Sequence, residues 1–271
     1  MDDVRPSLPV GSDRFMDRLR QDMREKGYAY PTEKTYCLWI KRYIRFHNMR
    51  HPEEMGAEEI NAYLSFLATR YGCSPATQRV VLNAVIYLYR KFLGRELEPL
   101  LFEKASPRRR LPTVLSHGEV QRVLEKLTGV HKLMVELLYG AGLRLNELLS
   151  LRVKDIDFEL STVTVRSGKG DKDRTTLLPV RLKAPLEEQI ASVAKLHRRD
   201  LEDGYGEAYM PYALGKKYPT QSRELGWQFV FPATKVGPCP RTGVLRRHHL
   251  HHTALRRHIR RARQEAGIIK P

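Results

Sequence analysis

The sequence has few cysteines and no long apolar run, and both absences exclude whole classes of protein. Its 271 residues include three cysteines, Cys37, Cys73 and Cys239, which are odd in number and widely scattered. This spacing supports neither a disulfide framework nor a paired-cysteine metal site. No apolar run approaches the ~20 residues of a membrane span, and the start, MDDVRPSLPVG, lacks the basic and apolar regions of a secretory signal. We therefore expect a soluble, reduced, cytosolic protein.

Acidic residues are scarce relative to basic ones. The chain has 48 Lys and Arg against 31 Asp and Glu, which gives a formal net charge of +17 at pH 7. Its hydrophobic content of 41% is enough for packed cores and excludes wholesale disorder. The length allows roughly two domains, and a folded chain of this charge predicts a polyanionic partner. Ribosomal or membrane-surface binding would give the same charge, so charge alone does not identify that partner.

Residues 1–97 predict a helical domain with basic faces. Capping residues and apolar residues at helical spacing predict four helices, at about 13–26, 32–47, 57–71 and 75–93. Basic side chains such as Lys41 and Arg42 lie between the apolar stripes. They are either a solvated face or contacts to phosphate groups.

Residues 98–113 interrupt this periodicity and predict a linker. Two prolines flank the basic triplet Arg108, Arg109 and Arg110. The segment is either a plain exposed tether or a basic strand that follows a phosphate backbone.

From residue 114 the pattern predicts a second, mixed domain. Ser116 and Glu119 have the spacing of a capping box at the start of a helix, and further helices are expected at about 131–139 and 145–151. Residues 162–165 and 174–178 predict two strands joined by the turn Gly168-Lys169-Gly170-Asp171-Lys172. Two more helices are expected, at 181–202 and at 246–266. The fold class is therefore mainly α with a small antiparallel β element.

Two basic residues of this domain stand where chemistry is possible. Arg144 follows a glycine and begins a helix, so it either faces an anion or pairs with Glu147. Lys169 lies between two glycines, so it either is a solvated turn residue or approaches a phosphate closely enough to protonate a leaving alkoxide.

Taken together, these segments resemble the tyrosine recombinases, also called phage-type integrases. The resemblance rests on the basic helical domain, the linker, the segment GAGLRLNELLSLRVKDID and the hairpin motif GKGDKDR. Residues 196–233 resemble the stretch that marks integron integrases within that family. The resemblance implies a SAM-like core-binding domain at 1–97 and a catalytic domain at 114–271, with an integron-type insertion at about 196–245.

The resemblance also implies a reaction: site-specific recombination of integron gene cassettes by DNA strand cleavage and rejoining. A tyrosine attacks a DNA phosphodiester and forms a 3′-phosphotyrosine, and a strand's 5′-hydroxyl reverses the step without metal or nucleotide cofactor. Arginines stabilise the phosphorane and a general acid protonates the leaving oxygen. By motif match Arg144 is the first catalytic arginine and Lys169 the general acid, while Lys172 and Arg174 are expected near phosphate.

The implied partners are duplex integron attachment sites and folded single-stranded cassette hairpins, held by a homo-oligomer that forms a tetrameric synapse in the bacterial cytoplasm at the nucleoid. Extrahelical bases of such hairpins would be held by stacking and histidine contacts, which carry over to Trp227, Pro232, His248 and His249. An equal alternative is that Trp227 anchors the core. His248 and His252 have the spacing of zinc ligands, but no carboxylate or cysteine completes a site, so no metal is expected.

The sequence departs from the family pattern at its C-terminal end. An HxLRH motif, a later His or Trp and the nucleophilic Tyr normally follow the segment Gly267-Ile268-Ile269-Lys270-Pro271, and the last tyrosine here is Tyr218. His258-Ile259-Arg260-Arg261 matches H-x-x-R but belongs to the helix that precedes that motif. The expectation is a truncated catalytic domain that keeps about half of the catalytic residues. The rival interpretation is a catalytically inactive DNA-binding protein, whereas a helical transcription factor explains neither the hairpin nor residues 196–233.

Overall fold

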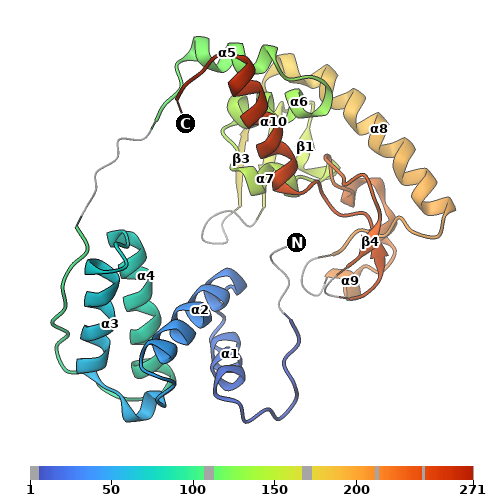
Figure 1. Ribbon diagram of the computed structural model, residues 1–271. Helices are drawn as coiled ribbons and strands as arrows, with labels where there is room; N and C mark the ends of the chain where they lie inside the picture. Colours follow the sequence, from blue (N-terminus) through green and yellow to red (C-terminus); the bar gives the residue numbers. More distant parts are fainter. Residues whose placement is uncertain (1–5, 107–112, 167–172, 211–213, 240–241, 271) are drawn as a thin grey trace. The chain divides into compact units, whose positions relative to one another are not determined.

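Two units make up the chain in the computed structural model, Met1–Pro112 and Thr113–Pro271, and each has its own apolar core. The structure describes all residues except 1–5, 107–112, 167–172, 211–213, 240–241 and 271 (Figure 1). The arrangement of elements within each unit is mainly helical, with small antiparallel sheets in the second. The predicted fold class is therefore confirmed.

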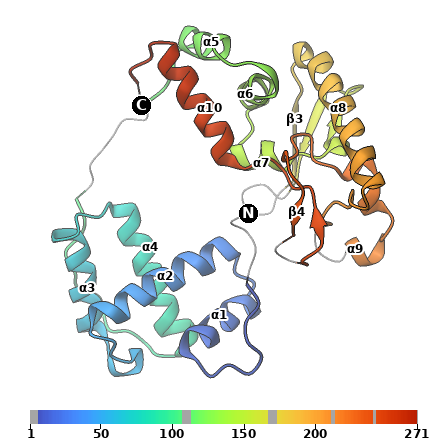
Figure 2. The same cartoon turned by 45° about the vertical axis from the view of Figure 1, so that its right-hand side comes forward.

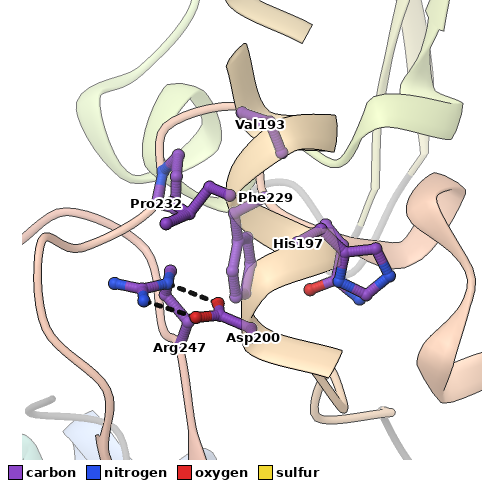
Figure 3. Close-up of a pocket in the computed structure, with 8 residues that line it drawn as sticks. Val193, His197, Asp200, Phe229, Pro232 and Arg247 are labelled. Carbon is purple, nitrogen blue, oxygen red and sulfur yellow. Dashed lines mark hydrogen bonds and ion pairs between the residues drawn. The ribbon is translucent and has the colours of Figure 1, made fainter. Parts of the chain in front are cut away.

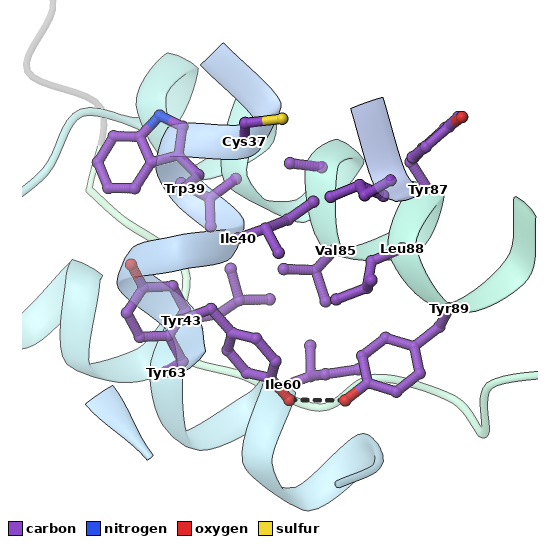
Figure 4. Packing of buried hydrophobic residues seen from close by; sticks show 14 of the residues in the cluster. Cys37, Trp39, Ile40, Tyr43, Ile60, Tyr63, Val85, Tyr87, Leu88 and Tyr89 are labelled. Atoms are coloured by element: carbon purple, nitrogen blue, oxygen red, sulfur yellow. Dashed lines mark hydrogen bonds between the residues drawn. The ribbon is translucent and has the colours of Figure 1, made fainter. Parts of the chain in front are cut away.

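The N-terminal unit packs its helices around a core rich in aromatic residues (Figure 4). The Tyr43 and Tyr89 hydroxyls meet at 2.9 Å inside this core. Ser74 caps the fourth helix by accepting a hydrogen bond from the Thr77 amide at 3.2 Å, and Pro75 occupies its first turn. The elements are α1 (Phe15–Glu25), α2 (Tyr30–Phe46), η1 (Pro52–Glu54), α3 (Ala57–Thr69), α4 (Pro75–Ile86) and η2 (Tyr87–Phe92).

The fourth helix ends differently from the regular helix that was predicted to about residue 93. Its last part, η2, is a π-helix in which three consecutive residues, Tyr87, Leu88 and Tyr89, are buried. A regular α-helix of 3.6 residues per turn turns three consecutive residues onto different faces, whereas the π-helix is wider. The π-helical winding thus coincides with the stretch in which three residues in a row are buried.

The first part of the segment predicted as a linker packs against this unit. Leu100 and Phe102 lie against the core, and the Gln78 amide donates to the Glu103 carbonyl at 2.8 Å. The Gln78 side-chain oxygen accepts from the Ala105 amide at 2.9 Å, and Ala105 is buried. Of the remaining part, the triplet Arg108 to Arg110 lies outside the described residues.

The C-terminal unit opens with helices and then forms a three-stranded antiparallel sheet of order β1-β2-β3. Its first helix has the predicted capping box, in which the Ser116 and Glu119 side chains satisfy each other's backbone amides. The first elements are α5 (His117–Glu125), α6 (Gly129–Ala141), α7 (Leu145–Ser150), η3 (Val153–Asp155), β1 (Ile156–Asp157), β2 (Thr162–Val165) and β3 (Arg174–Leu177). The strand pair β2–β3 matches the predicted hairpin, with Val165 opposite Arg174 at the end next to the turn.

The rest of the unit consists of a long helix, an irregular insertion and a final basic helix. Both views place α9 and β4 near the C-terminal end of α8 (Figures 1 and 2). The elements are η4 (Val180–Leu182), α8 (Lys183–Glu202), α9 (Leu214–Lys217), η5 (Gln221–Arg223), η6 (Leu225–Trp227), β4 (Gly237–Pro238), β5 (Leu245–Arg246) and α10 (His252–Glu265). No helix in the part of the chain that the structure describes has the length and apolar character needed to cross a membrane.

The final helix starts later than the predicted residue 246. Residues 246–251 are extended instead: the Ala233 amide donates to the His248 carbonyl at 2.7 Å, and the Leu250 amide donates to the Phe231 carbonyl at 2.8 Å. These long-range hydrogen bonds occupy backbone groups that a helix would use. The helix α10 therefore begins only after its N-cap residue, His251. The sequence pattern lacked any sign of this pairing.

Candidate active site and nucleic-acid interface

A tight turn between α6 and α7 places Arg144 at the start of a helix. Gly142 ends α6 with a φ of +63°, a left-handed conformation that glycine adopts without strain. Leu143 is buried and anchors the turn, so Arg144 follows in extended conformation as the N-cap of α7. The Arg144 side chain remains 60% exposed. Because buried Leu143 fixes the backbone of the turn, the exposed guanidinium group of Arg144 can contact an external anion.

Glu147 binds two arginines at once. Its side chain is 8% exposed, and its oxygens accept from Arg144 Nη1 at 2.7 Å and from the Arg144 backbone amide at 2.8 Å. They also accept from Arg174 Nη1 at 2.8 Å and Arg174 Nη2 at 2.7 Å. The predicted alternative in which Arg144 pairs with Glu147 is thus present, and Arg144 is exposed as well.

These contacts keep Glu147 ionised. The Arg174 hydrogen bonds are the largest cause, and together with those of Arg144 they lower the pKa of the Glu147 carboxyl to about 2. Two guanidinium groups and one carboxylate leave a net charge of +1 at this cluster. The cluster can therefore stabilise negative charge that develops on a bound phosphate.

The end of the β2–β3 hairpin next to its turn lies beside this cluster. Arg174 is the first residue of β3, and the Thr176 hydroxyl donates to the Ala141 carbonyl at the end of α6 at 2.9 Å. The strand is thereby tied to the turn that presents Arg144. Lys169 and Lys172, in the turn of the hairpin, lie outside the described residues.

Trp227 lies in the insertion and is 9% exposed, packed with Ala208 and Met210. The ammonium group of Lys154 lies 2.8 Å from the centroid of its ring, and the Arg152 guanidinium lies 5.2 Å from it. Arg152 also donates to the backbone carbonyls of Trp227 and Tyr209. Stacking of a base on this ring therefore requires the Lys154 side chain to move.

The other predicted insertion residues meet around Phe229. The ring centroids of His248 and His249 lie 5.2 and 5.3 Å from that of Phe229, and Pro232 forms an isolated bridge with His249. Phe229 also lies 4.8 Å from Arg152, the residue that contacts Trp227. The structure thus brings Trp227, Pro232, His248 and His249 into one neighbourhood through Phe229 and Arg152.

A buried ion pair holds this neighbourhood to α8. Arg247 Nε and Nη2 each lie 2.6 Å from the Asp200 carboxylate, with side chains 12% and 6% exposed, and Arg247 Nη1 donates to Ala233 at 2.9 Å. One turn earlier, His197 Nε2 lies 2.8 Å from the Arg223 carbonyl. Asp200 and Arg247 meet beside Phe229 and Pro232 in a small pocket (Figure 3).

On the N-terminal unit, the predicted contact residues Lys41 and Arg42 are both exposed on α2. The Arg42 guanidinium lies 4.7 Å from the centroid of the Trp39 ring. Among the described residues no cluster of three or more His, Cys, Asp or Glu could hold a metal ion.

Sequence reasoning missed the Arg174–Glu147 and Asp200–Arg247 pairs. The Arg144–Glu147 spacing of three residues was visible as a local pattern, whereas the other partners lie 27 and 47 residues apart. Only the tertiary fold brings such residues together.

Comparison with known proteins gives matches along both units. The phage integrase N-terminal SAM-like domain matches residues 15–99, and the phage integrase family matches residues 113–271. The chain belongs to the phage integrase family. The predicted family resemblance is thereby confirmed, while the integron subgroup stays a prediction.

Individual members of the phage integrase family agree with this assignment. An "Integrase/recombinase" from Escherichia coli is 41% identical over 268 residues, which cover 98% of this chain and 79% of that protein. The tyrosine recombinase XerA of Pyrococcus furiosus is 37% identical over 159 residues, 57% of this chain and 52% of that protein. The crystal structure of a lambda integrase tetramer bound to a Holliday junction has a TM-score of 0.60 at 15% identity, covering 93% of this chain and 63% of that chain. This last likeness concerns the fold alone.

Proposed function

We propose that the chain binds integron recombination sites and serves site-specific DNA recombination by strand cleavage and rejoining. The observation that carries this proposal is the Arg144 guanidinium, which is exposed yet oriented by a buried carboxylate beside the turn end of the hairpin. Membership of the phage integrase family supports the reaction class. No cofactor is part of the proposal, because the proposed transfer conserves the phosphodiester bond energy in a covalent link.

The proposed roles follow from charge and position. Arg144 contacts the non-bridging oxygens of the phosphate that reacts, and Lys169 protonates the leaving oxygen. The remaining basic residues neutralise phosphates along the duplex. These are Lys41, Arg42, Arg108, Arg109, Arg110 and Lys172, while Arg174 stands near the bound phosphate through its hydrogen bonds to Glu147.

The proposed substrate specificity resides in the insertion. Trp227, Pro232, His248 and His249 are proposed to hold extrahelical bases of a folded single-stranded cassette hairpin. Their shared neighbourhood supports the proposal, and the resemblance of residues 196–233 to integron integrases motivates it. We also propose that four copies form the synapse on two paired sites, in the bacterial cytoplasm at the nucleoid.

A binding experiment tests the substrate class. Affinity is measured for a duplex attachment site, a scrambled duplex of equal length, a cassette hairpin with extrahelical bases, and the same hairpin with those bases deleted. The proposal expects at least about tenfold tighter binding of the attachment site than of its scramble, a common margin for specific recognition. Equal affinity for all four DNAs would contradict it.

A second candidate function is DNA binding without cleavage by this 271-residue chain alone. Tyr218, the last tyrosine of the sequence, directly follows α9 in the insertion, whereas the arginine cluster stands on α7 and β3. We expect the purified chain to bind a nicked suicide substrate but to form no covalent protein–DNA band on denaturing electrophoresis. A covalent band would contradict this second function, and mapping the linked residue would identify the nucleophile.

A further inference from the structure

We infer that Arg174 is a positioning residue, which acts on the bound phosphate through Glu147 and Arg144 rather than by touching DNA. The inference rests on the proposed function only in taking a DNA phosphate as the ligand of Arg144. It assigns Arg174 a role different from the direct phosphate contact expected from the hairpin motif.

The hydrogen bonds of the two arginines differ. Arg174 directs both terminal nitrogens at Glu147, at 2.8 and 2.7 Å, in the paired geometry that makes arginine–carboxylate contacts strong. Arg144 directs only Nη1 at Glu147, at 2.7 Å. Arg144 thus gives one terminal nitrogen to Glu147 and Arg174 gives both, so Arg144 keeps more of its five N–H donors for an external anion.

Burial and exposure divide the three residues in the same way. Glu147 is 8% exposed, Arg174 36% and Arg144 60%. The carboxylate is therefore buried, and of the two arginines Arg144 presents the larger exposed fraction to an external phosphate.

The balance of charge explains why Arg174 matters to a ligand that it does not touch. With Arg174 present, one carboxylate is shared by two guanidinium groups and the cluster keeps a net charge of +1. Without Arg174, the Glu147 carboxylate is neutralised by Arg144 alone and the cluster is neutral. Arg144 would then bind phosphate in competition with its own partner.

The position of Arg174 at the start of β3 gives its contact with Glu147 a second effect. As the first residue of β3, it stands opposite Val165 at the end of the hairpin next to its turn. Its contact with Glu147 therefore fixes the start of β3 to the first turn of α7. This contact adds to the Thr176–Ala141 hydrogen bond, which ties the same strand to the end of α6.

The test is whether removing the Glu147 carboxylate restores the DNA affinity that is lost when Arg174 is removed. Affinity for a scrambled duplex is measured by fluorescence anisotropy at low salt for the 271-residue chain and for Arg144→Ala, Arg174→Gln, Glu147→Gln and the double variant Arg174→Gln/Glu147→Gln. We expect Arg174→Gln to weaken binding by about fivefold to tenfold, comparable to Arg144→Ala, as for loss of one phosphate contact. The double variant should return to within about threefold of the unmodified chain, because Arg144 is again unopposed.

A direct phosphate contact by Arg174 predicts a different pattern. In that case the double variant stays as weak as Arg174→Gln, because the contact is lost in both, and the inference is overturned. An unchanged affinity of Arg144→Ala would overturn the phosphate role of Arg144 and the positioning role of Arg174 together. Loss of the rescue with a normal Arg144→Ala effect would overturn the positioning role alone.

The N-terminal unit offers a matched control. Arg20 and Asp17 form an ion pair at 3.2 Å on α1, so Arg20→Gln and Arg20→Gln/Asp17→Asn repeat the same changes of charge in a pair that is not part of the cluster. We expect neither to change affinity by more than about twofold. Thermal unfolding checks that the variants fold, and if Arg174→Gln does not, Arg174→Met with and without Glu147→Gln gives the same comparison, because Met also removes the positive charge.

Discussion

At the scale of single residues, Glu147 is the side chain on which the site depends. It is the N3 residue of α7, so the same carboxylate caps the helix and orients two arginines. The capping role follows from local sequence spacing, because an acidic residue three positions after the N-cap is a helix-start signal. The role of binding Arg174 does not follow from spacing, because it depends on the path of the chain between them.

The first prediction at this scale concerns pH. The pKa of Glu147 is lowered from 4.5 to about 2 in the folded chain, chiefly by Arg174. The folded state thus binds fewer protons than the unfolded state between these values, so the stabilisation is present above about pH 4.5 and is lost as pH falls toward 2. We expect the free energy of unfolding of the unmodified chain to exceed that of Glu147→Gln by about 3 kcal/mol near pH 6, from the shift alone.

Urea titrations of both proteins at several values between pH 3 and pH 6 measure this difference. It should shrink steadily as the pH is lowered. A difference that is the same at every pH would show that Glu147 stabilises the fold by packing rather than by charge.

The second residue-scale prediction concerns Trp227. Its ring is largely buried and Lys154 covers one face, so the proposed stacking of a base on Trp227 requires Lys154 to move. We expect Trp227→Ala to weaken binding of a hairpin with extrahelical bases more than binding of plain duplex, by about 1–3 kcal/mol for each base that stacks.

Trp39→Ala is the matched control, because Trp39 is a similarly buried tryptophan in the other unit. It should not discriminate between the two DNAs. Equal losses on both DNAs for Trp227→Ala, together with a lower melting temperature, would show that Trp227 is only a core anchor.

At the scale of elements, regular structure was predictable and irregular structure was not. The helices and the β2–β3 hairpin follow from periodicity and turn residues, which act over a few positions. The irregular segment at residues 203–251 depends instead on partners that are distant in sequence, such as Asp200 for Arg247 and Phe231 for Leu250. Because such long-range contacts set the start of α10, its predicted start was wrong. The π-helical end of α4 was also not predicted.

The prediction at this scale is that the insertion depends on α8. Asp200→Asn leaves the buried Arg247 guanidinium without its carboxylate, and losing one partner of a buried pair costs about 3–5 kcal/mol. We expect the protection of residues 228–250 from amide hydrogen exchange to fall, while that of α5 and α6 persists.

The exposed pair Arg261–Glu265 on α10 gives a control, with side chains 79% and 43% exposed. Glu265→Gln should leave the protection of these residues unchanged, because an exposed ion pair contributes little to stability. Uniform loss of protection across the C-terminal unit of Asp200→Asn would show that the ion pair supports the whole unit and not the insertion.

At the scale of the whole molecule, charge is the property that both units share. The net charge of +17 was evident from composition, and the exposed arginine of the candidate site and the exposed basic residues of α2 show two places where it reaches the surface. Composition predicted the class of partner, but the site required the fold, because Arg144, Glu147 and Arg174 come together from two separate elements. The family assignment agrees with both the composition and the arginine cluster, because a DNA strand-transfer protein needs a basic surface and a cluster that can bind phosphate.

The central claim is that DNA phosphates are the ligand of this chain and that Arg144 contacts one of them. The measurement is the binding constant for duplex attachment-site DNA across a series of salt concentrations, for the unmodified chain, Arg144→Ala and the control Arg20→Ala. We predict a steep linear fall of the logarithm of the binding constant with the logarithm of salt concentration, by about 0.9 per phosphate neutralised, and a slope smaller by about one phosphate in Arg144→Ala only. A binding constant that does not change with salt, or a slope that Arg144→Ala leaves unaltered, would contradict the account.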